Sequence, residues 1–220
     1  MKSFVIIVAG GVGTRMGSST PKQFLNLGNK PILAHTITRV NKISPKSELI
    51  VVLPKNQIDY WKSICNKYNI NIEHKIVEGG NTRFESVKNG LKKVTPDSLV
   101  AIHDGVRPLL NKTVFDRCMQ KAQEKGAAIP TIPITDSLRE INTQGSVIKD
   151  RNSFVKVQTP QCFDSNILLK AYKQPFNQSF TDDASVVETM GKKVFLVEGN
   201  KENIKITTPE DIKIATAFML

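Results

Sequence analysis

Glycines and cations follow the first apolar run of the chain. Residues 5–25 read VIIVAGGVGTRMGSSTPKQFL. The glycines of this stretch are Gly10, Gly11 and Gly13. Glycines let backbone N–H groups approach a ligand without interference from a Cβ atom, and successive amides of this kind bind anions. Arg15 and Lys22, seven residues apart, could flank a triphosphate and neutralise charge during transfer, so the stretch indicates a nucleotide-binding loop.

This loop fits neither of two familiar phosphate-binding patterns. A Walker loop closes with Gly-Lys-Ser or Gly-Lys-Thr, and that triplet does not occur here. A dinucleotide fingerprint needs a third glycine, where this chain has Met16. It also needs an acidic residue after the second strand, where Leu53 leads into Pro54 and Lys55. The sequence therefore favours a nucleotide site of a different kind.

A second glycine pair follows a later apolar run, in the stretch EGGNTRFESV. Gly79 and Gly80 again offer bare backbone. Arg83 and Ser86 lie one turn apart at the start of an expected helix and could face the same crevice.

The stretch IHDGVRP places a carboxylate after the next run. Asp104 could hold Mg²⁺ through its waters, and Arg107 follows on the turn, although a turn or helix cap is the alternative role for Asp104. His103 is expected to be a hydrogen-bonded histidine at a strand end, because His35 and His74 do not form a metal-spaced set with it.

The elements that must position these residues alternate between strand and helix. Apolar, β-branched runs typical of buried parallel strands cover residues 5–9, 49–53, 72–77, 99–103 and 127–132. Apolar stripes at helical spacing cover residues 58–68, 84–94 and 114–122. This alternation predicts an α/β fold, with a doubly wound, mostly parallel, Rossmann-like sheet and a ligand crevice at the carboxyl ends of its strands.

Residues 135–157, TDSLREINTQGSVIKDRNSFVKV, break this rhythm. Polar and apolar residues alternate around a turn at Gln144–Gly145, a pattern that predicts a β-hairpin. A two-stranded hairpin is marginally stable alone, so we expect either a surface decoration or a protruding arm that reaches a second subunit.

Composition limits the remaining possibilities. The chain has 220 residues, of which 40% are hydrophobic, which suits one domain over residues 1–220. A net charge of +11 fits either a lysine-rich surface or anionic partners. Three cysteines without a CxxC pair argue against a disulfide framework or a zinc site, and Cys65 and Cys118 are expected to be core residues. Since no apolar run approaches the length of a membrane span or signal peptide, a cytoplasmic protein is expected.

Six separated motifs resemble those of the 2-C-methyl-D-erythritol 4-phosphate cytidylyltransferases, in that family's order. They are AGGVGTRMGSSTPKQFL, EGGNTRFESV, HDGVRP, QTPQCF, TDDASVVE and ENIKITTPEDI, and the resemblance covers essentially the whole chain. It implies a nucleotidyltransferase fold and an intertwined homodimer. It also implies formation of CDP-methylerythritol and pyrophosphate from CTP, a step of non-mevalonate isoprenoid biosynthesis.

The resemblance further implies roles for individual residues. Arg15 and Lys22 would stabilise charge on the transferring phosphate, and Asp104 would face Mg²⁺. The nucleotide pocket would comprise Ala9, Gly10, Gly11, Gly13, Gly80, Arg83, Ser86 and Gly105. The acceptor site and its wall would comprise Arg107, Asp136, Ser137, Arg151, Thr159 and Lys205. Because the arm of this family reaches the neighbouring subunit, Asp136, Ser137 and Arg151 would serve the partner's active site.

Three motifs carry further expectations. Thr159, in QTPQ, is expected to shape the pocket, and Asp182, with Thr181, is expected chiefly to cap a helix. In HDGVRP, Gly105 and Val106 replace two alanines that family members often have, which is expected to alter packing near the ribose.

Two alternative functions stay open at this point. A ribitol 5-phosphate cytidylyltransferase shares the fold and the CTP loops. A basic nucleic-acid-binding domain fits the charge, but the chain is only 6% aromatic and has no stacking motif or dense basic helix. The expected partners are therefore CTP, a sugar-alcohol phosphate and a second copy of the chain, with no nucleic acid and no membrane.

Overall fold

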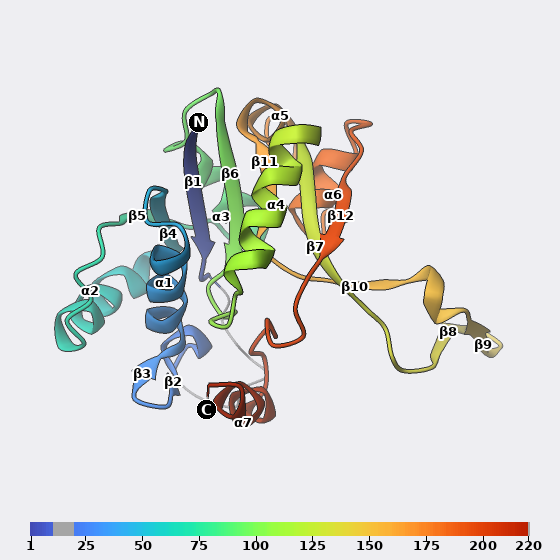
Figure 1. The fold of residues 1–220 in the computed structure, drawn as a ribbon, viewed down its shortest axis with the longest axis horizontal. Coiled ribbons are helices and arrows are strands. Elements are labelled where there is room, and N and C mark those ends of the chain that lie inside the picture. Colours follow the sequence, from blue (N-terminus) through green and yellow to red (C-terminus); the bar gives the residue numbers. More distant parts are fainter. Residues whose placement is uncertain (11–19, 220) are drawn as a thin grey trace.

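An eight-stranded sheet forms the centre of the computed structural model, which describes residues 1–10 and 20–219 (Figure 1). Its strands are β1 (Lys2–Val8), β4 (Glu48–Leu53), β5 (Lys75–Glu78), β6 (Ser98–Asp104), β7 (Ala127–Pro133), β10 (Val155–Val157), β11 (Gln161–Asp164) and β12 (Phe195–Glu198). They lie in the order β10-β7-β11-β6-β1-β4-β5, and β12 also pairs with β7. The expected α/β class is confirmed.

Most strand pairs of this sheet are parallel, as the sequence predicts. Strand β1 pairs in parallel with both β4 and β6, and β4 pairs in parallel with β5. Strand β11 is antiparallel to both of its neighbours, β6 and β7, and separates them. Strand β10 is also antiparallel to β7. The carboxyl ends of β1, β5 and β6 consequently meet at one edge of the sheet.

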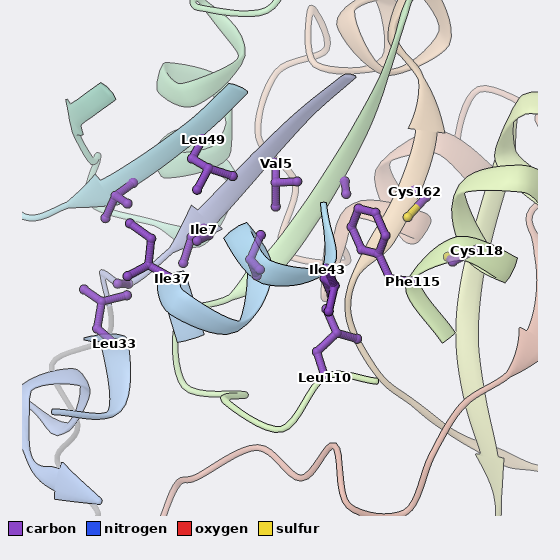
Figure 2. Close-up of a cluster of buried hydrophobic side chains, with 14 of the residues drawn as sticks. Val5, Ile7, Leu33, Ile37, Ile43, Leu49, Leu110, Phe115, Cys118 and Cys162 are labelled. Carbon is purple, nitrogen blue, oxygen red and sulfur yellow. The ribbon is translucent and has the colours of Figure 1, made fainter. Parts of the chain in front are cut away.

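Side chains along each strand alternate between the two faces of the sheet. Because the strands carry apolar residues on both faces, helices cover both of them. The helices are α1 (Ile32–Ile43), α2 (Ile58–Lys67), α3 (Arg83–Leu91), α4 (Lys112–Lys125), α5 (Ser165–Ala171), α6 (Asp183–Glu188) and α7 (Pro209–Ala217). Val5 and Ile7 of β1 join the core under α1, α2 and α4, part of which Figure 2 shows. Phe4 and Ile6 join the opposite core under α3, α5 and α6. These two cores fix the strand ends that build the site.

The expected elements differ from the observed ones mainly at their ends. Each of the five apolar runs contributes a strand, but β1 ends at Val8 and β5 begins only at Lys75. The three expected helical stripes lie in α2, α3 and α4. Cys118 is fully buried, as expected, whereas Cys65 is half-buried.

A hairpin of strands β8 (Leu138–Asn142) and β9 (Gly145–Lys149) extends away from the main sheet (Figure 1). It is shorter than the expected segment 135–157, because Val155–Val157 pairs with β7 as strand β10. Its turn lies one residue earlier than expected, at residues 143–144. Gly145, with φ of 129°, already belongs to β9 and pairs with Asn142. Its role as a dimerisation arm stays a prediction.

A third, smaller core supports the segment before α7. Leu27 and Ile32 pack there with Val106, Ile206 and Ala215. Leu27 belongs to a small antiparallel pair, β2 (Asn26–Leu27) and β3 (Lys30–Pro31). Among the described residues, no helix is both long and apolar enough to cross a membrane.

Candidate nucleotide-binding site

A pocket of about 300 Å³ opens where β1, β5 and β6 end. Its wall includes Lys22 and Gln23 of a short 3-10 helix, η2 (Lys22–Phe24). Eight residues expected from the sequence line it: Ala9, Gly10, Lys22, Gly80, Arg83, Ser86, Asp104 and Lys205. The other expected loop residues, Gly11, Gly13 and Arg15, lie outside the described residues.

Ser86 organises the loop after β5. Its hydroxyl accepts a hydrogen bond from the Gly80 N–H at 3.1 Å and donates to the Thr82 carbonyl at 2.9 Å. Thr82 and Glu85 form a capping box that starts α3. An ideal Cβ on Gly80 would lie only 2.3 Å from the Glu85 Cβ, so this position requires glycine.

Asp183, which the sequence analysis missed, holds Arg83 in place. The Asp183 side chain is fully buried, and its carboxylate accepts hydrogen bonds from Arg83 Nη2 at 2.5 Å and from the Tyr172 hydroxyl at 2.6 Å. A buried carboxylate needs such partners, because an unpaired charge there would be costly. The neighbouring Asp182 caps α6, as expected, and also accepts from Gln161 Nε2 at 2.7 Å.

Asp104 is a buried carboxylate between two cations. Its Oδ2 atom lies 3.1 Å from both Arg107 Nε and Lys205 Nζ. Burial alone would raise the pKa of Asp104, but Lys205, Arg83 and Arg107 together hold it well below its usual range. Because of these cations, the Asp104 carboxylate is charged at neutral pH.

Arg107 lies behind this pocket. Its Nη1 donates to the Asn203 carbonyl at 2.7 Å, so it joins the segment after β6 to the segment that carries Lys205. Since it does not line the pocket, its position suits the expected role in fixing a wall.

Thr159 links Asp104 to His103 through hydrogen bonds of its hydroxyl group. Its hydroxyl accepts from the Asp104 N–H at 3.0 Å and contacts His103 Nδ1 at 2.9 Å, while His103 Nε2 contacts the Arg107 carbonyl at 3.0 Å. A carbonyl can only accept, so Nε2 carries the proton and Nδ1 accepts from Thr159. His103 is thus the fully hydrogen-bonded histidine that the sequence predicts.

The stability of the protein is expected to fall in mild acid because of His103. Burial lowers the pKa of His103 from 6.5 to about 4, so between these values the unfolded chain binds a proton that the folded chain does not. Lowering the pH from 7 to 5 should therefore reduce the free energy of unfolding by about 2 kcal/mol through this group. Urea unfolding of the wild type and of His103→Gln at both pH values measures the difference. Equal losses in the two proteins would contradict this assignment.

Gln23 is a second pocket residue that the sequence analysis missed. It is fully buried, and its Nε2 donates to the Ala9 carbonyl at 2.8 Å and to Gln57 Oε1 at 2.6 Å. Its Oε1 has no hydrogen-bond partner among the described residues. In the sequence, only its position directly after Lys22, in the stretch PKQ, could have indicated that Gln23 belongs to the pocket.

Gly105 packs closely against the first strand. Its N–H donates to the Val8 carbonyl at 2.8 Å, and an ideal Cβ there would lie 2.8 Å from the Cβ of Ala9. An alanine at this position would therefore require Ala9 to shift, whereas the adjacent Val106 fits into the third core. Gly105 supports the wall and does not line the pocket.

The hairpin residues expected to bind the acceptor lie away from this pocket. Ser137 and Arg151 line a separate shallow cavity at the base of the hairpin. Asp136 precedes Ser137, and Arg151 Nη1 donates to the Thr135 carbonyl. Within one chain these residues therefore do not join Lys22 and Lys205.

Of the described residues that line the pocket, Asp104 alone offers a carboxylate to a metal ion. Among the described residues, no group of three histidine, cysteine, aspartate or glutamate side chains could hold a metal. Mg²⁺ commonly binds through one or two carboxylates together with substrate phosphates. Asp104 fits that mode, provided that the phosphates of a bound nucleotide complete the coordination.

The fold and the pocket define an α/β protein with a cation-lined pocket at the carboxyl edge of a Rossmann-like sheet. Among the described residues, three cations and one carboxylate line this pocket, beside Gly10 and Gly80 in the segments that follow β1 and β5.

Comparisons with known proteins identify the family. The family model described as IspD, 2-C-methyl-D-erythritol 4-phosphate cytidylyltransferase, matches residues 3–220. A protein of that name from Bacteroides fragilis is 50% identical over 97% of this chain and 98% of its own length. One from Bacteroides thetaiotaomicron is 49% identical over the full length of both chains.

Solved structures agree with this assignment. The crystal structure of 4-diphosphocytidyl-2C-methyl-D-erythritol synthase from Anaerococcus prevotii is similar with a TM-score of 0.81 and 31% identity, over 99% of this chain and 98% of that one. The Thermus thermophilus 2-C-methyl-D-erythritol 4-phosphate cytidylyltransferase gives a TM-score of 0.78 at 30% identity, over 99% and 98% of the chains. The chain belongs to the IspD family of nucleotidyltransferases, as its motifs predict.

Proposed function

We propose that this protein transfers a cytidylyl group from CTP to 2-C-methyl-D-erythritol 4-phosphate, releasing pyrophosphate. The observation that carries the proposal is the gathering of Lys22, Arg83 and Lys205 around Asp104 in a pocket with glycine-containing walls. The family and the names of its close relatives supply the identity of the substrates.

The reaction joins two anions, so the main tasks of the protein are alignment and neutralisation. An oxygen of the acceptor phosphate attacks the α-phosphorus of CTP in line, and pyrophosphate leaves on the opposite side. Lys22 and Lys205 would offset the negative charge that grows on the phosphates. Arg83, held by Asp183, would keep a third positive charge at the pocket wall.

Backbone groups would select the base. Ala9 and Gly10, which follow β1, lie in the same pocket as the Gly80 loop. Gln23 holds the Ala9 carbonyl, and Ser86 holds the Gly80 N–H. A base whose donor and acceptor pattern does not match would leave buried polar groups unpaired.

Mg²⁺ is proposed as the cofactor, held by Asp104 together with the nucleotide phosphates. When bound, it would supply positive charge that offsets the negative charge of the phosphates. Asp104 stays ionised because neighbouring cations lower its pKa, so it is ready to accept the ion over the physiological pH range.

A homodimer with exchanged hairpins is proposed as the working unit. Ile141 and Ile148 of the hairpin are 86% and 70% exposed, which favours cover by another subunit. Asp136, Ser137 and Arg151 would then reach the partner's acceptor site, where Lys205 of that subunit lies. The single-domain organisation and the cytoplasmic location stay predictions.

A pyrophosphate-release assay tests both substrates together. CTP with methylerythritol phosphate is expected to give the highest kcat/KM, about 10² above UTP, because a mismatched base leaves buried groups unpaired at a cost of about 1–3 kcal/mol. Ribitol 5-phosphate should be used at least about tenfold less well. Equal turnover of CTP and UTP would refute cytidylyl specificity.

The same assay separates the alternatives. A preference for ribitol 5-phosphate would replace the acceptor but keep the nucleotide chemistry. Strong, salt-dependent binding of DNA or RNA to filters, without pyrophosphate release, would instead favour a nucleic-acid-binding domain.

A further inference from the structure

A second cavity, of about 540 Å³, lies between α1 and the residues that follow α7. Its other walls come from the loop before α4 and from the segment around Asn200. Its volume falls within the range of about 300–1,000 Å³ that is usual for small-molecule sites. It shares no lining residue with the catalytic pocket among the described residues.

One polar face of α1 forms a wall of this cavity. His35, Thr38, Arg39 and Lys42 line it, at the spacing that places residues on the same side of a helix. The opposite side of α1 is buried in the core through residues such as Ile37. The sequence of α1 therefore builds the core with one face and presents a row of polar groups with the other.

Three cations of this cavity lack an acidic partner among the described residues. Lys30 and Lys42 make no ion pair there, and Arg39 donates from Nε to the Leu110 carbonyl at 2.6 Å, which fixes its orientation. Among the described residues of the wall, Glu202 is the one carboxylate, and it accepts from Asn200 Nδ2 at 3.1 Å. These lining residues thus carry a surplus of two positive charges, which matches the charge of about −1.5 to −2 on a phosphate group at neutral pH.

The other side of the cavity is apolar. Leu109 lies in the wall, and Phe218 and Met219, which are 47% and 44% exposed, lie near the chain end. A ligand with a phosphate at one end and a hydrocarbon body at the other would satisfy both sides. We propose that this cavity binds a small organic phosphate ester with an apolar body, at a site distinct from the catalytic pocket.

The two pockets are connected by shared segments. Ile206 N–H donates to the Val106 carbonyl at 3.0 Å, and Arg107 Nη1 donates to the Asn203 carbonyl. The segment from Asn200 to Lys205 borders both pockets. Asn200 and Glu202 line the second cavity, and Lys205 lines the catalytic pocket.

Calorimetric titration of the full chain with hexyl phosphate tests the proposal. The double variant Lys30→Glu/Lys42→Glu is expected to bind about tenfold more weakly than the wild type, because two attractions become repulsions. Lys46→Glu, which reverses an exposed lysine outside this cavity, is the matched control and should bind normally. Lys205→Ala removes a cation from the catalytic pocket and should also leave this binding unchanged.

Inorganic phosphate should bind at least about tenfold more weakly than hexyl phosphate, since it lacks the apolar body. The proposal is overturned if hexyl phosphate does not bind the wild type, or if inorganic phosphate binds equally well. It is also overturned if Lys205→Ala weakens binding and the Lys30/Lys42 variant does not, because the ligand would then occupy the catalytic pocket.

Discussion

Replacing Lys22 by alanine is expected to lower kcat by about 10²–10³-fold while CTP binding changes little. Lys22 lines the proposed catalytic pocket at the start of η2, next to the buried Gln23. A cation that interacts more strongly with the transition state than with the bound substrate affects kcat more than KM. Loss of one such electrostatic group typically costs about 2.7–4 kcal/mol.

The chain offers a close control for this experiment. Lys55 also follows a proline and also begins a 3-10 helix, η3 (Lys55–Gln57), but it does not line the proposed catalytic pocket. Lys55→Ala should therefore keep near-normal kcat in steady-state pyrophosphate-release assays. Near-normal turnover by Lys22→Ala would remove Lys22 from the proposed charge-stabilising role.

Mixing two inactive variants is expected to restore activity if the hairpins are exchanged. Arg151→Ala and Lys22→Ala should each be about 10²–10³-fold impaired as homodimers, since each removes a proposed phosphate contact. In a mixed dimer, one site would carry both lesions and the other would carry neither. With about half of the dimers mixed at random, activity should return to roughly a quarter of the wild-type value.

A second hairpin arginine provides the control here. Arg139 is also exposed, but it hydrogen-bonds Ser146 of the neighbouring strand. Arg139→Ala should stay active on its own, which would show that loss of a hairpin arginine does not by itself inactivate the protein. If subunit exchange is confirmed and the mixture of Arg151→Ala with Lys22→Ala stays inactive, Arg151 does not act across subunits.

The sequence predicted those parts of the fold that have a local periodic signal. The apolar runs of β1 and β6 and the stripes of α2, α3 and α4 were all found in the expected elements. The place of β11 was not predictable in this way. Its four residues form no long apolar run, and its position between β6 and β7 depends on contacts far away in the sequence.

The same distinction holds for the pocket. Gly80 and Asp104 could be placed together because parallel strands end at a common edge. Asp183 could not be linked to Arg83, because the pair joins the first residues of α3 and α6, which lie 100 residues apart in the sequence. The boundary of the hairpin was also uncertain from sequence, since Val155–Val157 alternates like a hairpin strand but pairs with β7.

The insertion of β11 between β6 and β7 also constrains the order in which the protein can fold during synthesis. The early elements β1, β4 and β6 can pair through β1 once residue 104 has emerged from the ribosome. Strand β7, although translated next, has no direct pairing with β6 and must wait for residues 161–164. The nascent chain would therefore expose an open edge of β6 while about sixty further residues emerge from the ribosome, at roughly 5–20 residues per second. During those several seconds the open edge of β6 could pair with a strand of another chain. Chaperone binding, or prompt pairing with β11, would prevent this.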